Sequence, residues 1–317
     1  MTSATTTRTI PALVPAPVGS GRLVDLADVP EPVPATDEAV IAVEAFSLNR
    51  GEVLLLEAPR AGWRPGQDIA GRIVQAAADG SGPAAGTRVV AHAPQGGWAA
   101  RAAVPTGAIA ALPDAVGIEQ AATLGVASLT ALRLLRAAPN LGGRRVLLTG
   151  AAGGVGHFVV ELAAAQGALV TAVTSSPDRG ARLLDLGAAE VVTRVEDAAG
   201  RFELVLESVG GASLATAVTK AAPGATVLWF GQASREPVTL DFFALAAAAP
   251  YVRIVPFSYW RTGASDADDL ATLARLVAGG RLHPEIGRVE DWAHTDALLA
   301  ALRDRRLRGN AVLTVSA

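Results

Sequence analysis

Residues 144–167 read RRVLLTGAAGGVGHFVVELAAAQG, a hydrophobic strand that runs into a glycine-rich turn and then into an apolar helix. Glycines in such a turn let backbone amides approach a pyrophosphate, and the helix N-terminus faces the anion with unpaired N–H groups. The flanking strand and helix make this glycine pattern specific. The alternative is a glycine-rich turn without a ligand. We predict a dinucleotide site that includes the turn residues Gly150, Ala151, Ala152, Gly153, Gly154 and Val155.

Hydroxyl and basic side chains follow at the end of the next predicted strand, residues 168–174. An NAD-specific site needs a carboxylate there, whereas Thr174, Ser175 and Ser176 offer hydroxyl donors. A 2′-phosphate needs such donors together with a guanidinium, which Arg179 supplies. We expect Asp178 in the first turn of a helix, where its negative charge interacts favourably with the positive end of the helix dipole. These residues predict NADPH as the cofactor, and the alternative is that the serines only cap the helix.

The expected secondary structure changes along the chain. Residues 1–120 read as short strands separated by Pro and Gly, which is typical of an antiparallel barrel or sandwich. One helix is expected over residues 118–138, and then apolar strands alternate with helices in the manner of a parallel sheet. We therefore predict an α/β protein with a substrate domain at 1–120, a nucleotide-binding domain at 121–263 and a return to the first domain over 264–317.

The composition excludes several classes of protein. Half of the 317 residues are hydrophobic, but the longest uncharged apolar run, residues 242–252, is broken by Pro250 and is too short to span a membrane. The net charge of −3 offers no basic surface for nucleic acid. The N-terminus has no apolar core behind a basic start, so we expect no signal peptide and a cytoplasmic protein.

Cysteine is absent, which excludes disulfides, thiolate catalysis and sulfur-ligated metal sites. His92 and Asp68 could supply two zinc ligands, whereas a catalytic zinc takes three protein ligands and a water. The other histidines are scattered along the sequence. We therefore predict that the chain holds no metal.

Segments along nearly the whole chain match one known family, in the family's order. They are AFSLNRGE, GQDIAGRIV, GTRVVAH, GGWAARAAV, AATLGVASLTALRLL, LLTGAAGGVG, SSPDRGARLLDLGAAEVV, LVLESVGG, the turn at Gly231 and GNAVLTV. With these segments the chain resembles the zinc-independent quinone oxidoreductase (zeta-crystallin-like) branch of the medium-chain dehydrogenase/reductase superfamily. The resemblance implies a GroES-like, barrel-type substrate domain interrupted by a doubly wound Rossmann domain, with the active site in the cleft between them.

The resemblance also implies roles for single residues. Thr130 and Val209 are expected near the nicotinamide, and Gly231 with Gln232 is expected to form a backbone wall beside the cofactor. Asn310 stands where the family often has a lysine, which weakens the cofactor contact expected there.

Asn49 matches a frequent active-site asparagine of the family. Relatives often follow it with a tyrosine or an aspartate, whereas this chain has Arg50 and Glu52, so no proton donor can be carried over.

Aromatic side chains are the remaining candidates for donors and pocket walls. Tyr259 is a candidate proton donor that could reach the cleft together with Trp260, and ordinary packing is the alternative. Tyr251 is expected to open a strand over residues 251–258 and to pack. Trp63 could form one wall of an apolar substrate pocket or shield the domain edge.

Arg50 is a candidate for recognising an acidic group of the substrate, and the alternative is a salt bridge to Glu52 or Glu57. Without zinc, conjugate reduction is easier than reduction of an isolated carbonyl, because a few hydrogen bonds can stabilise the developing enolate.

We therefore predict an NADPH-dependent oxidoreductase that transfers hydride to a quinone or an activated double bond. A step in secondary metabolism is one option for this reaction. The alternative is an NADPH-binding sensor or structural protein without activity. The apolar segment at residues 251–258 would be a poor exposed edge, so we also predict a homodimer.

Overall fold

A computed structural model of the chain describes residues 8–138 and 140–316. The expectation about the N-terminus rests partly on residues 1–7, which lie outside the described residues. The chain divides into two compact units: unit 1 comprises Met1–Leu129 and Ala264–Ala317, and unit 2 comprises Thr130–Gly263.

Unit 2 is built on a parallel sheet with the strand order β10-β9-β8-β11-β12-β13. The strands β8, β9 and β11 are almost entirely buried apolar runs, because a parallel strand is covered on both faces. The strands are β8 (Arg145–Thr149), β9 (Leu169–Val173), β10 (Glu190–Val192), β11 (Phe202–Glu207), β12 (Ala221–Trp229) and β13 (Arg253–Pro256). The helices are α4 (Gly154–Ala164), α5 (Pro177–Asp185), α6 (Gly211–Thr219), α7 (Phe242–Ala248) and the short 3-10 helices η2 (Val195–Asp197) and η3 (Tyr259–Arg261).

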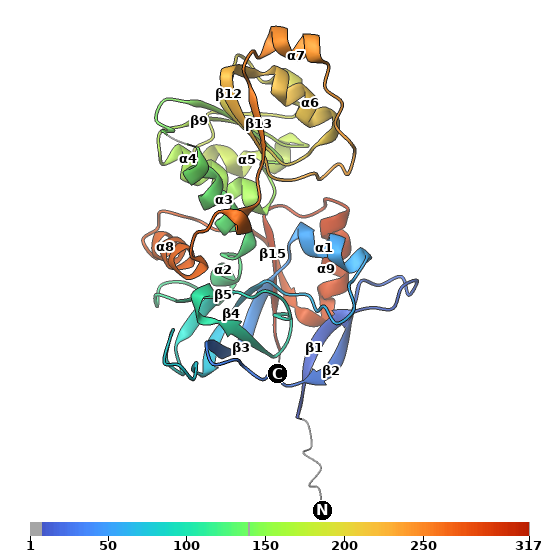
Figure 1. Cartoon of the computed structure of the whole chain (residues 1–317), viewed down its shortest axis with the longest axis vertical. Helices are drawn as coiled ribbons and strands as arrows, with labels where there is room; N and C mark the ends of the chain where they lie inside the picture. Colours follow the sequence, from blue (N-terminus) through green and yellow to red (C-terminus); the bar gives the residue numbers. More distant parts are fainter. Residues whose placement is uncertain (1–7, 139, 317) are drawn as a thin grey trace, which may run out of the picture. The chain divides into compact units, whose positions relative to one another are not determined.

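The strand order of unit 2 reverses direction at β8. From there the chain adds β9 and β10 on one side, and β11, β12 and β13 follow on the other. Because parallel crossovers are right-handed, the reversal places α4 and α5 on one face of the sheet and α6 on the opposite face (Figure 1). The carboxyl ends of β8 and β11 therefore lie side by side at the reversal, where open α/β sheets bind ligands.

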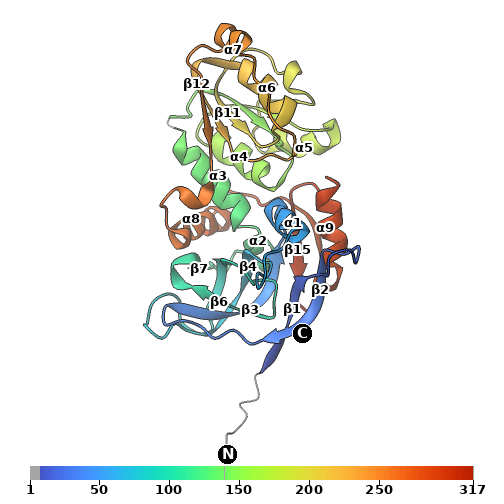
Figure 2. The ribbon, with the colours of Figure 1, turned by 45° about the vertical axis from the view of Figure 1, so that its right-hand side comes forward.

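Unit 1 is a mixed sheet with the order β14-β15-β3-β4-β5-β7, in which β6 also pairs with β3, and β1 pairs separately with β2. The C-terminal strand β15 pairs antiparallel with β3, so the last segment of the chain completes the sheet that the first segment begins. Helices α1 and α9 pack against each other in this unit (Figure 2).

The strands of unit 1 are β1 (Thr9–Pro15), β2 (Val24–Pro30), β3 (Glu38–Ser47), β4 (Asp68–Gln75), β5 (Arg88–His92), β6 (Arg101–Pro105), β7 (Ile109–Ala111), β14 (Ile286–Asp291) and β15 (Asn310–Thr314). Its helices are α1 (Arg50–Glu57), α2 (Ile118–Ala122), α8 (Asp266–Ala278), α9 (Thr295–Arg303) and the 3-10 helices η1 (Thr106–Ala108) and η4 (Trp292–His294). Helix α3 (Val126–Ala137) begins in unit 1 and continues into unit 2.

Two expectations about local structure are wrong. The single helix expected over residues 118–138 is two helices, because the chain breaks between α2 and α3 and a side chain from β4 accepts the first N–H of α3. Tyr251 does not open a strand or pack: it lies in a turn with φ of 62° and is 90% exposed. The strand β13 therefore begins only at Arg253.

Candidate functional site

The turn after β8 has the shape that a phosphate cradle requires. Gly150 has φ of +64°, and a Cβ atom there would lie 2.4 Å from Ser208 Oγ. A Cβ atom on Gly156 would lie 2.2 Å from the carbonyl oxygen of Ala151. Both positions therefore admit only glycine without a shift of their neighbours, one for the sharp turn and the other for close packing of α4.

The backbone of this turn is fixed by hydrogen bonds to its neighbours. The Ala151 amide donates to Val173 O of β9 at 3.0 Å, and the Gly153 amide donates to Gly150 O at 3.0 Å. Gly153 is the N-cap of the 11-residue helix α4, whose first N–H groups have no acceptor within the helix. Because the helix also carries a partial positive charge at this end, the turn can bind a pyrophosphate.

The end of β9 carries the residues expected at a 2′-phosphate. Thr174 is buried, and its hydroxyl has no hydrogen-bond partner among the described residues. Ser176 is the N-cap of α5, but its side chain makes no capping bond within the described residues, which does not favour a purely structural role. Ser175 is exposed beside it, and Arg179 is half-buried in the first turn of α5. Asp178 lies in that first turn, so the expected position is confirmed.

A buried carboxylate connects the two turns at the strand reversal. Glu207, the last residue of β11, accepts hydrogen bonds from Thr149 Oγ1 at 3.0 Å and from Ser213 Oγ at 2.9 Å. Its other oxygen accepts the backbone N–H groups of Val209 at 3.1 Å and Gly210 at 2.8 Å. Glu207 therefore fixes the end of β8 relative to the turn that leads into α6, and our sequence analysis did not single it out.

The segments after β11 and β12, which contain the residues predicted to form a wall beside the cofactor, contact each other. Val209 is half-buried, and its carbonyl accepts the amide of Ser234 at 2.8 Å. A Cβ atom on Gly210 would lie 2.7 Å from Gln232 Cγ, so the two turns pack closely here. The carbonyl of Gly231 accepts Trp229 Nε1 at 2.6 Å.

The remaining predicted residues of unit 2 lie on α3 and η3. Thr130 is buried on α3. Tyr259 is 7% exposed and packs edge-on against Trp260 with ring centroids 5.1 Å apart. Arg133 Nη1 donates to the Tyr259 carbonyl at 3.1 Å, which connects η3 to α3. Trp260 is 67% exposed, so it forms no closed pocket wall within unit 2.

A second polar centre lies in unit 1 around Asp68, the first residue of β4, which is fully buried. Its Oδ2 accepts Asn49 Nδ2 at 2.7 Å and Ser47 Oγ at 3.0 Å. Its Oδ1 accepts the Val126 amide at 2.7 Å. Burial raises the pKa of Asp68, while the neighbouring His92 and these hydrogen bonds oppose the shift. Of these residues, the sequence indicated Asn49 as catalytic and considered Asp68 only as a zinc ligand.

A second buried carboxylate lies beside this centre. Glu52 accepts the backbone N–H groups of Gly66 and Gln67 on Oε1, both at 3.0 Å, and that of Asn49 on Oε2 at 3.0 Å. These hydrogen bonds hold the start of α1 against the segment before β4. Burial, and then the charge of Asp68, raises the pKa of Glu52 from 4.5 to about 8. Glu52 is fully buried, so its carboxyl group accepts backbone hydrogen bonds and does not form a surface salt bridge.

Three other predicted residues of unit 1 are spread over different elements. Arg50 is exposed at the start of α1. Trp63 is half-buried and packs against the hydrophobic core of the unit. Asn310 is buried at the start of β15, and its Nδ2 donates to Glu285 O at 3.2 Å. The Asn310 amide therefore has a structural partner in unit 1.

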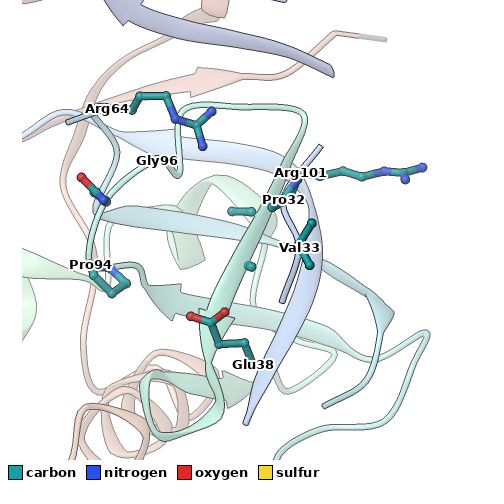
Figure 3. A pocket seen from close by; sticks show the side chains of 10 residues that line it. Pro32, Val33, Glu38, Arg64, Pro94, Gly96 and Arg101 are labelled. Carbon is teal, nitrogen blue, oxygen red and sulfur yellow. The ribbon is translucent and has the colours of Figure 1, made fainter. Parts of the chain in front are cut away.

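A surface cavity of about 360 Å³ lies elsewhere in unit 1, among the segment 94–96, the start of β6 and the start of β3 (Figure 3). Arg64, Glu38 and Pro94 are among the residues that line it. None of the predicted catalytic or substrate residues lines this cavity.

Comparison with known proteins agrees with this geometry. Residues 154–275 match the sequence family described as zinc-binding dehydrogenase. A chloroplastic quinone-oxidoreductase homolog of Spinacia oleracea is 36% identical over 52% of this chain and 55% of its own length. The mitochondrial enoyl-[acyl-carrier-protein] reductase of Mus musculus is 30% identical over 68% of this chain and 63% of its own length. A mycobacterial structure complexed with NADPH is 26% identical, with a TM-score of 0.86 over 96% of this chain and 99% of that chain.

The chain is similar to the medium-chain dehydrogenase/reductase superfamily, and within it to the zinc-independent quinone oxidoreductases. The predicted fold class, an α/β protein with a Rossmann part and a substrate-binding part, is confirmed. The chain spans between half and two thirds of the length of the two curated relatives, 55% and 63% respectively. No helix of the described residues is long and apolar enough to cross a membrane.

The donor groups of this chain do not fit zinc. The chain has no cysteine, and within residues 8–138 and 140–316 no three His, Asp or Glu side chains are grouped as metal ligands. Both oxygens of Asp68 accept hydrogen bonds, and His92 Nδ1 lies 2.8 Å from Asp266 Oδ2. A tetrahedral site of three protein ligands and a water therefore has no donor set here.

Proposed function

We propose that the chain is an NADPH-dependent oxidoreductase that transfers hydride to a quinone or to a double bond conjugated to a carbonyl. The observation that carries this proposal is the glycine turn after β8, which packs so closely that a Cβ atom on Gly150 or Gly156 would collide with neighbouring protein atoms. Such a turn lies at the strand reversal where open α/β sheets bind dinucleotides. The names of the relatives, quinone oxidoreductase and enoyl reductase, support the reaction class.

Each unit has its own part in the proposal. In unit 2 the amides of residues 150–155 would bind the pyrophosphate, and Thr130, Val209, Gly231 and Gln232 would contact the nicotinamide half. Thr174, Ser175, Ser176 and Arg179 would bind the 2′-phosphate, because hydroxyl and guanidinium donors match its oxygens. NADPH, when bound, supplies the hydride. Unit 1 would bind the substrate through Asn49, Arg50 and Trp63.

The proposed substrate follows from the groups available to polarise it. Asn49 is half-buried and carries an amide donor, which can hydrogen-bond the carbonyl oxygen of a quinone or an enone. Hydride addition at the conjugated carbon builds negative charge on that oxygen, and a donor already aimed at it stabilises the enolate. Tyr259 is proposed as the donor of the final proton and Asn310 as a contact to the cofactor, both carried over from the sequence.

Steady-state oxidation of NADPH with a panel of quinones, enones, enals and enoyl thioesters tests the reaction. We expect turnover with at least one class of acceptor and no dependence on added zinc. Tight binding of NADPH without turnover across the whole panel would favour the alternative, a cofactor-binding sensor or structural protein.

The cofactor preference is tested separately by titrating NADPH and NADH into the wild type and the Arg179→Ala variant. Loss of a charge-assisted contact to the 2′-phosphate should weaken NADPH binding by about 10-fold and leave NADH binding unchanged. Equal affinities of the wild type for the two cofactors would contradict the assignment.

We also propose that the chain forms a homodimer through β13. This strand is at one end of the sheet of unit 2, and Arg253, Val255 and Pro256 are exposed on it. An edge strand with free backbone groups can pair with a second copy of itself. Light scattering at micromolar concentration should give twice the mass of the chain, and a monomeric mass would refute this proposal.

A further inference from the structure

Three hydrogen-bond donors from separate elements converge on the carboxylate of Asp68. Ser47 is the last residue of β3, Asn49 is the N-cap of α1, and Val126 is the first residue of α3. Their donor atoms lie 3.0, 2.7 and 2.7 Å from the carboxylate oxygens. Asp68 thus connects β3 and α1, which follow each other in the sequence, to the start of α3, which is distant from both.

The Asp68 carboxylate occupies the space that a side chain at position 125 would need. A Cβ atom on Gly125 would lie 1.9 Å from Asp68 Oδ1, so any side chain there would displace the carboxylate. The φ of Gly125 is not in the left-handed region, so the turn itself does not demand glycine. The glycine is therefore explained by the space that Asp68 needs.

Asp68 determines how Asn49 presents its amide. Both oxygens of Asp68 accept hydrogen bonds, and Oδ2 accepts the one from Asn49, so the Asn49 amide turns its Nδ2 toward Asp68. That nitrogen has two hydrogens, and one bond to Asp68 leaves the second hydrogen for another acceptor. Asn49 is half-buried, whereas Asp68 is fully buried, so the amide is the part of this centre that a ligand can reach.

We propose that Asp68 is a positioning residue for the reduction: it holds the Asn49 amide so that its second N–H points at the carbonyl oxygen of the substrate. The proposal rests on the proposed function for the role of Asn49 toward substrate. Positioning of the amide itself is a property of the protein without substrate. The two can therefore be tested apart.

The first experiment follows the side-chain amide of Asn49 by NMR in protein labelled with 15N-asparagine. The Asn49→Asp variant assigns the signal by its disappearance. A charge-assisted hydrogen bond deshields the bonded proton, so we expect one amide proton of Asn49 to be shifted downfield in the wild type. The shift should be lost in Asp68→Asn, where two amide groups face each other, and kept in Asp269→Asn, which alters another buried carboxylate of unit 1.

The second experiment measures turnover in the same variants. Asp68→Asn should lower kcat by about 10- to 100-fold, because misplacing one group at a reacting centre has this order of effect. The dissociation constant for NADPH should stay within about twofold, since unit 2 is unchanged. The double variant Asn49→Asp/Asp68→Asn reverses donor and acceptor, so it should restore the buried hydrogen bond and the melting temperature but not the turnover.

Two further variants keep the test decisive if Asp68→Asn fails to fold. Gly125→Ala displaces the carboxylate without changing it and should reproduce both the NMR change and the loss of kcat. Ser47→Ala removes one donor and leaves the Asn49 bond, so it should keep the amide shift and most of the turnover. An Asn49 amide signal that is unmoved in Asp68→Asn and in Gly125→Ala overturns the proposal, whatever the activities are.

A wild type that shows the shifted amide but no turnover with any acceptor would refute the proposed function and support the positioning of Asn49 by Asp68. Full turnover in a folded Asp68→Asn variant whose amide signal has moved would overturn the positioning role in the reaction.

Discussion

The glycine turn of unit 2 and the Asp68 centre of unit 1 are built in different ways. The turn is one continuous segment whose backbone amides form the candidate site, and side chains are excluded from Gly150 and Gly156. The Asp68 centre is made by side chains from β3, β4 and α1, together with one amide of α3. A backbone site carries no titratable group of its own, whereas the side-chain centre contains two buried carboxylates, Asp68 and Glu52.

The two sites should therefore be sensitive to different changes. The glycine turn should fail when a Cβ atom is added and should be insensitive to pH. The carboxylate centre should respond to pH and to isosteric changes that add no atoms. Four experiments test this contrast.

The largest effect is expected from Glu52→Gln on the pH dependence of stability. The folded chain keeps a proton on Glu52 up to about pH 8, whereas the unfolded chain releases it near 4.5. The unfolded state therefore binds fewer protons in this window, and the free energy of unfolding falls as pH rises from about 4.5 to about 8. We expect the wild type to lose on the order of a few kcal/mol across the window.

Urea unfolding of the wild type and Glu52→Gln at pH 5, 6.5 and 8, followed by tryptophan fluorescence, measures this slope. The slope should be much flatter in the variant. A smaller slope of the same sign should remain, because the pKa of Asp68 is also raised. Parallel pH profiles for the two proteins would show that Glu52 does not titrate in this window.

Gly150→Val should have the next largest effect. Valine strongly disfavours a φ of +64°, and its Cβ would meet Ser208 Oγ at 2.4 Å. NADPH binding should weaken by about 100-fold, which corresponds to about 2.7 kcal/mol. The control is Gly143→Ala, which has φ of +73° but open space around its Cβ and should bind NADPH normally. Equal losses in both variants would show that backbone strain alone matters.

Glu207→Gln should have a smaller effect, because it leaves the glycines in place. The carboxylate accepts the Val209 and Gly210 amides on one oxygen, and an NH2 group there would face two donors. We expect about 10-fold weaker NADPH binding, measured by titration calorimetry, and a loss of about 2 kcal/mol in stability. Ser213→Ala removes one donor to the other oxygen and should cost less. Unchanged binding in Glu207→Gln would mean that the turn does not depend on side-chain support.

The smallest effect is expected from Tyr259→Phe. The variant removes the hydroxyl that is proposed to donate the final proton, and because water can replace such a donor, kcat should fall by only about fivefold while NADPH binding stays unchanged. A kcat equal to that of the wild type would show that Tyr259 only packs, in line with its burial and its edge-on contact with Trp260.

The sequence predicted the parts of this protein that are local. The turn at residues 150–156 and the strand and helix around it are contiguous, and the apolar runs of β8, β9 and β11 follow from burial on both faces of a sheet. The place of Asp178 in the first turn of α5 followed from helix electrostatics.

The errors and omissions come from long-range contacts. Helical periodicity is continuous across residues 118–138 and does not indicate the break, whereas the start of the new helix is marked by a bond from the Val126 amide to Asp68, 58 positions away. Glu207 was missed because its partner Thr149 lies on another strand. Tyr251 was placed in a strand by its apolar neighbours, whereas the turn before β13 gives it a positive φ and exposes it.

Residue type and neighbours along the chain set the class of the fold, the glycine-rich turn after β8 and the absence of sulfur ligands. Which polar groups meet depends on the tertiary structure, which brings Asp68 to Asn49 and Val126, and Glu207 to Thr149. The physical reason is that a buried carboxylate must find donors wherever the fold brings them, and residues distant in sequence supply them.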